Sequence, residues 1–381
     1  MSESECLPYD VVYDILTLLP VKLLMRLRCV SKSFNSIITN PVFINSHLDR
    51  GKKPLSNNNH GYLQYMPVTA DRAFKELSTL VYNTDRTFTQ ISRFQIPFSN
   101  GLVPKVDRIA GFCNGIFLLL SYDDTVLYLW NPSIRKSKKL LPSTIGRNQL
   151  FTLGFAYHSQ NNDFKILRIV CHKGCWPMAE VYTLSTDSWR EVVVPVDYLF
   201  RSFSQSNLSR SFSFFFNGAL HKVVDCVKPG FILSFDVNDE TFCKMMLPQH
   251  YLDEFEEPFE QLAEFKGLLA LFVFNNDVYD FDRISHIWVM REYGVFESWT
   301  KICVSMGFVD KYYGCTDSGE LLIENNIGLI SFHSESLSEN NLGISLSEDA
   351  KEYSQWVGYT ANSTESLVLL DRLDVSSKYE D

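Results

Sequence analysis

The residues that could do chemistry are few and widely separated along the chain. Cys171, His172 and Cys175 offer two thiols and an imidazole to a metal, but no second cysteine pair follows at zinc-finger spacing. His221 lies close to Asp225, and a strand histidine is a simpler interpretation of it than a general base. The chain has no G-x-G-x-x-G, P-loop, G-x-S-x-G or H-E-x-x-H motif. The sequence therefore predicts no catalytic residue, no metal site and no cofactor.

The composition favours a folded protein rich in β structure. The 381 residues carry a formal net charge of -10 without a basic stripe, which argues against nucleic-acid binding. Aromatic residues make up 14% and suit half-buried pleated surfaces. The N-terminus lacks the features of a signal peptide, and no apolar run reaches the roughly 20 residues that span a membrane. We expect no membrane partner, a cytoplasmic or nuclear location, and reduced cysteines.

The first 50 residues have the apolar spacing of short helices. One helix is expected over 9–19, with Pro20 ending it. A second should run to Val30, and a third should follow Ser31, a suitable N-cap, and stop at Asn40-Pro41. Three short helices cannot bury all this apolar surface among themselves. Some of it must pack on a partner or, alternatively, serve only to cap the next domain.

Beyond a polar linker, short β-rich runs separated by turn signals begin near residue 61. A turn followed by a short apolar strand recurs every 47 to 55 residues, and a run with aromatic ends recurs at 182–189 and 235–242. A repeat of about 50 residues with several strands indicates a kelch-type β-propeller, the alternative being a chance near-period. The second turn residues of this repeat are Gly61, Gly115, Asp163, Gly218, Gly267, Gly319 and Ser366.

Two sets of motifs carry a family resemblance. Leu7-Pro8-Tyr9-Asp10, Leu19-Pro20-Val21-Lys22, the stretch 27–32 and Pro41-Val42-Phe43 resemble an F-box, without a gap over 6–48. Residues 105–305 resemble the kelch-like F-box-associated domain of plant proteins, a group that includes the S-locus F-box proteins. The stretches that carry this second resemblance are 111–115, 129–135, 140–142, 154–157, 163–165, 180–190, 217–221, 233–236, 287–294 and 297–301. The family usually has tryptophan where this chain has Phe34 and Lys222.

The resemblance implies an α+β multidomain chain. A short three-helix F-box over residues 1–50 should precede a linker and the start of the β domain over 51–105. An all-β kelch-like propeller of six or seven blades should occupy 106–375. How the ring closes stays open at this point.

The resemblance also implies a function, that of the substrate-recognition subunit of a Skp–cullin–F-box ubiquitin ligase. Such a subunit does no chemistry. It binds a Skp-type adaptor, and through it the cullin and the RING subunit, while its second domain holds a protein substrate, unidentified here, near the charged conjugating enzyme. The positions that match the motif, and should make or support the adaptor interface, are Leu7, Pro8, Ile15, Leu16, Leu19, Pro20, Leu24, Val30 and Lys32.

Two inserted stretches are candidates for contacting the substrate. The stretch 198–216 carries Arg201 and Arg210, and the stretch 249–261 carries Glu254, Phe255 and Glu257. An acidic and aromatic loop could meet a basic partner, whereas the alternative is a solvated loop.

Two other functions stay open on the sequence alone. An F-box protein can act as an interaction scaffold outside a ligase, with adaptor binding but no cullin-dependent turnover of a target. A propeller enzyme would instead gather carboxylates with perturbed pKa values in the central channel.

Overall fold

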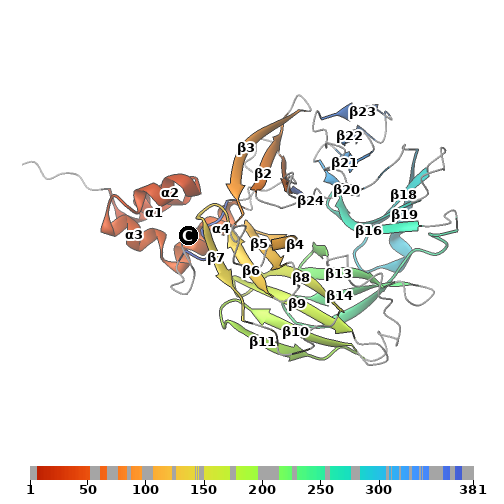
Figure 1. The fold of residues 1–381 in the computed structure, drawn as a ribbon, viewed down its shortest axis with the longest axis horizontal. Coiled ribbons are helices and arrows are strands. Elements are labelled where there is room, and N and C mark those ends of the chain that lie inside the picture. Colours follow the sequence, from red (N-terminus) through yellow and green to blue (C-terminus); the bar gives the residue numbers. More distant parts are fainter. Residues whose placement is uncertain are drawn as a thin grey trace, which may run out of the picture.

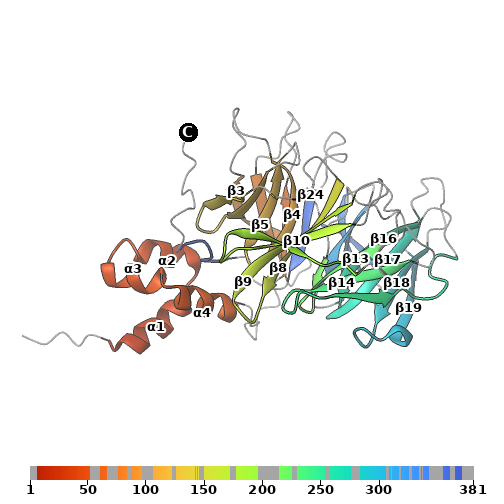
Figure 2. The same cartoon turned by 90° about the horizontal axis from the view of Figure 1, so that it is seen from below.

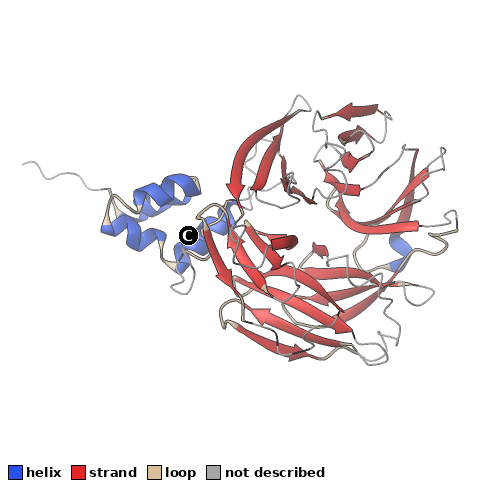
Figure 3. Ribbon diagram, viewed as in Figure 1, coloured by secondary structure: helices blue, strands red, loops and turns tan. Residues whose placement is uncertain are grey.

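In the described residues the four α-helices lie at the N-terminal end, and the other elements are strands apart from one short 3-10 helix, η2 (Phe296–Ser298) (Figure 3). The structure is a computed structural model. It describes residues 7–51, 61–66, 76–83, 87–96, 106–121, 126–141, 143, 145, 150–171, 177–195, 214–224, 230–253, 258–275, 284–305, 309, 311–316, 319–325, 328–333, 336, 338–342, 355–360 and 365–370.

Residues 7–51 form a helical unit of four short helices. They are α1 (Tyr9–Thr17), α2 (Val21–Leu27), α3 (Lys32–Ile38) and α4 (Pro41–Gly51). Pro8 and Pro20 lie at the N-caps of α1 and α2, where a missing backbone N–H removes no helical hydrogen bond. The Ser31 side chain accepts a hydrogen bond from the backbone N–H of Ser33 at 3.1 Å, which confirms the predicted N-cap of α3.

Helix α4 corrects the expectation of three helices. Asn40-Pro41 does end α3, but the same pair starts a new helix. The Asn40 side chain accepts a hydrogen bond from the N–H of Val42 at 2.8 Å, and Pro41 occupies the first helical position. Helix α4 packs on α1, where the Arg50 guanidinium donates to the Thr17 hydroxyl at 2.7 Å.

The β domain is a six-bladed propeller, because the described strands form six four-stranded antiparallel sheets. Blade 1 comprises β1 (Gly61–Met66), β2 (Glu76–Tyr82), β3 (Phe88–Gln95) and β24 (Gln355–Thr360); blade 2 comprises β4 (Val106–Cys113), β5 (Ile116–Ser121), β6 (Leu127–Asn131) and β7 (Lys136–Lys139); blade 3 comprises β8 (Leu150–His158), β9 (Asp163–Cys171), β10 (Met178–Thr183) and β11 (Ser188–Val192). Blade 4 comprises β12 (Phe214–Phe216), β13 (Ala219–Val224), β14 (Phe231–Asp236) and β15 (Phe242–Met246); blade 5 comprises β16 (Pro258–Phe265), β17 (Leu268–Asn275), β18 (Ile284–Met290) and β19 (Trp299–Ser305); blade 6 comprises β20 (Lys311–Cys315), β21 (Glu320–Glu324), β22 (Leu329–His333) and β23 (Ser338–Asn341).

The blades are arranged in a ring, with the helical unit outside it (Figure 1). Neighbouring blades contact each other through their first strands β4, β8, β12, β16 and β20, and β24 takes the equivalent place in blade 1. The middle strands of a blade are covered on both sides by neighbouring blades. All six residues of β5 are therefore buried, instead of buried and exposed residues alternating along the strand.

The ring closes by pairing strands from both ends of the β domain. β24 pairs antiparallel with β1, from Tyr62 opposite Thr360 to Met66 opposite Gln355. The Tyr82 hydroxyl of blade 1 also donates a hydrogen bond to the Glu320 carboxylate of blade 6. Closure therefore gives β1 a hydrogen-bonded partner on each side, as the second strand of every other described blade also has.

The repeat found in the sequence marks the start of the second strand of each blade. Asn114 and Gly115 have φ values of 48° and 79°, as a two-residue hairpin turn requires, and Asn217 and Gly218 repeat this geometry. Six of the seven predicted positions precede or begin β1, β5, β9, β13, β17 and β21. The seventh, Ser366, follows β24 and belongs to none of the described blades.

The largest apolar cluster joins the helical unit to the propeller. It contains residues of all four helices, of blades 2 and 3, and of the segment 365–370, which we name the C-terminal segment. Figure 2 shows this segment, in dark blue, beside α2. The helical unit is thus continuous with the hydrophobic core of the β domain.

Candidate functional site

The helical unit carries a concentration of exposed apolar side chains, which we name the apolar face. Eight of the fourteen large apolar side chains that are exposed in the described residues lie here, although the unit is a small part of the chain. Four of them, at positions 7, 11, 15 and 18, recur at helical spacing within α1 and close to its two ends, so they share one side of that helix. The eight are Leu7, Tyr9, Val11, Ile15, Leu18, Leu23, Val30 and Val42.

The predicted adaptor-binding residues divide into an exposed and a buried group. Val30 is 75% exposed and Leu7 is 59% exposed, whereas Leu24 is completely buried and Leu16 nearly so. Leu19 is partly buried, and its carbonyl oxygen lies 2.9 Å from the His47 ring nitrogen Nε2. The buried group would support the apolar face rather than contact an adaptor. The remaining predicted residues, all exposed, are Pro8, Ile15, Pro20 and Lys32.

Five residues of the apolar face are absent from the predicted set. They are Tyr9, Val11, Leu18, Leu23 and Val42. The spacing of residues 7, 11, 15 and 18 contains a signal for part of this set, since it places them along one helical stripe. Val42 carried no such signal because α4 was not expected.

The predicted substrate-contacting residues Arg201, Arg210, Glu254, Phe255 and Glu257 lie outside the described residues. The strands on either side of them are described. One stretch connects β11 to β12 and the other connects β15 to β16, so each joins the last strand of a blade to the first strand of the next. Both stretches therefore start and finish on the same face of the ring.

That face is opposite the one where blade 2 contacts the C-terminal segment. In a four-stranded antiparallel blade, the turn between the third and fourth strands lies away from the connection to the next blade. Asn131 ends the third strand of blade 2 at such a turn, and its side chain contacts the C-terminal segment next to α2. The described strand ends that flank the candidate substrate stretches thus lie on the face of the ring opposite the turn that contacts the C-terminal segment.

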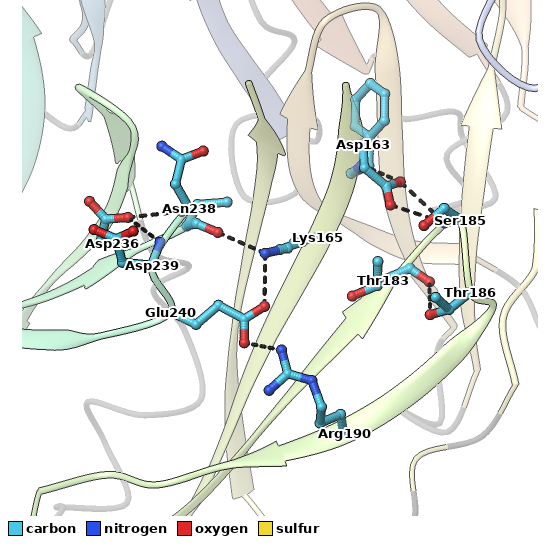
Figure 4. Close-up of polar contacts among 12 residues, drawn as sticks. Asp163, Lys165, Thr183, Ser185, Thr186, Arg190, Asp236, Asn238, Asp239 and Glu240 are labelled. Atoms are coloured by element: carbon cyan, nitrogen blue, oxygen red, sulfur yellow. Dashed lines mark hydrogen bonds and ion pairs between the residues drawn. The ribbon is translucent and has the colours of Figure 1, made fainter. Parts of the chain in front are cut away.

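A polar cluster links blades 3 and 4 (Figure 4). The Lys165 ammonium donates to the Val237 carbonyl oxygen at 2.9 Å and to the Glu240 carboxylate at 2.7 Å, and Arg190 pairs with the same carboxylate. Burial opposes ionisation of Glu240, but the hydrogen bonds from Lys165 and Arg190 outweigh it and hold the pKa of that carboxyl below its usual value.

The nearby aspartates hold turns. Asp163 accepts from the backbone N–H of Ser185 at 3.1 Å, and Asp236 accepts from the backbone N–H groups of Asn238 and Asp239, each at 2.8 Å. Each of these contacts holds a turn within its own blade, whereas the contacts of Lys165 and Arg190 with residues 237 and 240 join blades 3 and 4. The geometry of the cluster is that of a structural network.

His221 is a buried strand histidine. It is 1% exposed, and its Nε2 lies 2.7 Å from the Tyr293 hydroxyl. Burial lowers its pKa to about 4. Asp225 and most of the stretch 171–175 lie outside the described residues. Within the described residues no three His, Cys, Asp or Glu side chains are arranged to hold a metal ion.

The low pKa of His221 predicts a pH dependence of stability. The unfolded chain binds the proton near pH 6.5, whereas the folded chain binds it near pH 4. Between these values the unfolded state holds more protons, so the free energy of unfolding should fall by up to about 3 kcal/mol as the pH drops through this window. Urea denaturation across the window should give a shallower pH slope for His221→Gln than for the wild type. Equal slopes would contradict the prediction.

Comparison with known proteins shows which family each of the two domains belongs to. Residues 4–46 match the F-box domain, and residues 66–369 match the F-box associated beta propeller domain. The second match covers most of the chain.

This chain belongs to the family of F-box proteins with an F-box-associated β-propeller.

The helical unit is therefore the F-box, and the six blades are its associated propeller. The F-box protein CPR1 of Arabidopsis thaliana is 28% identical over 371 residues, covering 89% of this chain and 84% of its own. The F-box/kelch-repeat protein At3g23880 of the same plant is 23% identical and covers 86% and 87%. These relatives confirm the predicted resemblance to plant F-box proteins of kelch-like architecture. Among solved structures, TolB from Acinetobacter baumannii overlaps 78% of this chain and 66% of its own at 11% identity, with a TM-score of 0.43.

The helices of the F-box and the other described helix are all short. None of the described helices has the length and apolar character that crossing a membrane requires.

Proposed function

We propose that this F-box protein is the substrate-recognition subunit of a Skp–cullin–F-box ubiquitin ligase. The observation that carries the proposal is the apolar face, exposed on an F-box whose own core is already filled by Leu24, Ile38 and Phe43. Small, rigid apolar side chains on a fixed helical framework are good material for the centre of an interface. A Skp-type adaptor is the partner that an F-box implies, and the adaptor would link the chain to the cullin and the RING subunit.

The propeller would supply the second half of this function. We propose that the loops carrying Arg201, Arg210, Glu254, Phe255 and Glu257 contact the protein substrate. Their flanking strands end on one face of the ring, and loops at one face are where propellers bind their ligands. The subunit would then act by raising the effective concentration of substrate lysines at the charged enzyme, in the cytoplasm or the nucleus.

Adaptor binding should depend on the exposed residues of the apolar face. A double variant, Ile15→Asp and Val30→Asp, places two charges in the proposed interface without touching the F-box core. We expect at least a roughly 30-fold loss of affinity for a Skp-type adaptor, which corresponds to about 2 kcal/mol for a central interface residue. Binding of the purified proteins can be measured by calorimetry or by pull-down.

The matched control is Val193→Asp, which adds a charge at a propeller side chain that is 87% exposed. It should bind the adaptor as the wild type does. No binding by the intact, folded chain, or equal binding by the double variant, would contradict the proposal.

The ligase role can be tested separately from adaptor binding. Purified adaptor, cullin and RING subunit are mixed with the intact chain, and the assembly is analysed by size-exclusion chromatography. A ligase subunit should carry the cullin into the complex and accelerate ubiquitin transfer to proteins held by the propeller. If the chain binds the adaptor but the cullin is absent from the complex, the result would instead indicate a scaffold outside the ligase.

A further inference from the structure

The C-terminal segment is buried between the F-box and the propeller. Ser366, Leu367 and Leu369 are at most 1% exposed, and Leu370 is 5% exposed. Its apolar side chains belong to the cluster that contains the core residues of the F-box and of blades 2 and 3. Figure 2 shows the segment lying along α2 at the junction of the two domains.

The middle of the segment is anchored to the propeller by Asn131. The Asn131 amide donates hydrogen bonds to the carbonyl oxygens of Ser366 at 2.9 Å and Val368 at 2.8 Å. Its side-chain oxygen accepts from the backbone N–H of Ser133 at 3.0 Å, which orients the amide. Asn131 is completely buried, so these bonds have no water to replace them.

The first residue of the segment, Glu365, anchors it to the F-box. Its carboxylate accepts a hydrogen bond at 2.9 Å from the backbone N–H of Val21, the first residue of α2. The residue before it, Pro20, provides no side-chain cap for this helix. A carboxylate is also the favoured charge at the N-terminus of a helix. Glu365 thus caps α2 from the far end of the chain.

These contacts join the two domains at a place far in sequence from their covalent connection, residues 52–60. We propose that the C-terminal segment fixes the orientation of the F-box on the propeller, with Glu365 and Asn131 as its positioning residues. The fixed orientation would set the distance between a bound substrate and the charged conjugating enzyme. This last consequence rests on the proposed function, whereas the fixed orientation does not.

The test measures the distance between the domains in the full-length chain. Spin labels are introduced as non-canonical residues at Ser36 of α3 and Glu191 of β11, both exposed, so that the native cysteines stay untouched. Pulsed electron spin resonance should give one narrow distance distribution for the parent chain. The double variant Asn131→Asp and Glu365→Ala should lose this single distribution. Asn131→Asp keeps the acceptor for Ser133 but cannot donate to the segment.

Glu365→Gln is the matched control, since it keeps a side-chain oxygen for Val21 and should retain the narrow distribution. If the double variant does not fold, Glu365→Ala alone decides, because Glu365 is exposed and its removal leaves the core intact. A folded variant with the parent's narrow distribution would overturn the proposal. The same samples are tested for adaptor binding. Failure of the parent to bind would contradict the proposed function without changing the distance result.

Discussion

Replacing Arg168 with alanine is expected to lower the free energy of unfolding of the propeller by about 3–5 kcal/mol. Arg168 of β9 and Glu180 of β10 form an ion pair at 3.0 Å, with side chains that are 8% and 1% exposed. Arg168 also donates to the Ser143 hydroxyl and lies 4.7 Å from the centre of the Phe151 ring. Without the guanidinium, the Glu180 carboxylate would stay buried in blade 3 without its cation, which is the expensive state.

The control for this prediction removes both charges together. The double variant Arg168→Met and Glu180→Leu keeps similar volume and leaves no buried charge, so it should lose much less stability than Arg168→Ala. Urea denaturation monitored by tryptophan fluorescence measures both variants. A double variant as unstable as Arg168→Ala would show that lost packing, and not the buried charge, determines the effect.

Replacing Phe43 with alanine should unfold the F-box while the propeller stays folded. Phe43 is completely buried in α4, and its ring meets that of Tyr13 edge-on at 5.2 Å between centroids. Truncation of a buried phenylalanine costs about 3–5 kcal/mol. A helical unit this small has little stability to lose, so its helices should melt and adaptor binding should disappear.

The neighbouring variant Val42→Ala is the control, because Val42 is 68% exposed and its truncation should change stability by no more than about 0.5 kcal/mol. Amide hydrogen exchange resolves the two domains. Phe43→Ala should remove protection from α1 to α4 and leave that of the blades. Full protection of the F-box amides in Phe43→Ala would contradict the prediction. The double variant Ile15→Asp and Val30→Asp should also lose adaptor binding, but its F-box amides should keep their normal protection.

Local signals in the sequence predicted the parts of the fold that depend on local chemistry. Ser31 as an N-cap and Pro20 as a boundary were predicted because capping and proline geometry act within a few residues. The turn repeat located the blades because Asn114-Gly115 and Asn217-Gly218 need positive φ angles that few other residue pairs adopt. It gave six or seven blades rather than six, since Ser366 imitates the pattern outside the described sheets.

What depends on distant contacts could not be predicted in the same way. The sequence alone does not separate the buried Leu24 from the exposed Leu23, because both lie on an apolar helix and only the packing of α3, α4 and the propeller distinguishes them. The capping of Val21 by Glu365 joins residues 344 positions apart. No local sequence pattern indicates such a contact, so the position of the C-terminal segment between the two domains was not predicted from the sequence.

The origin of β24 has a consequence for how the protein is made. β24, the innermost strand of blade 1, is synthesised after all the other described strands. During translation, blade 1 therefore has only three of its strands and an open edge at β1. Incomplete domains with unpaired edges are the species that aggregate and engage chaperones during synthesis. A message with a stop codon before Gln355 would therefore yield an F-box attached to an unclosed ring, which the cell would treat as a misfolded protein rather than as a shorter functional one.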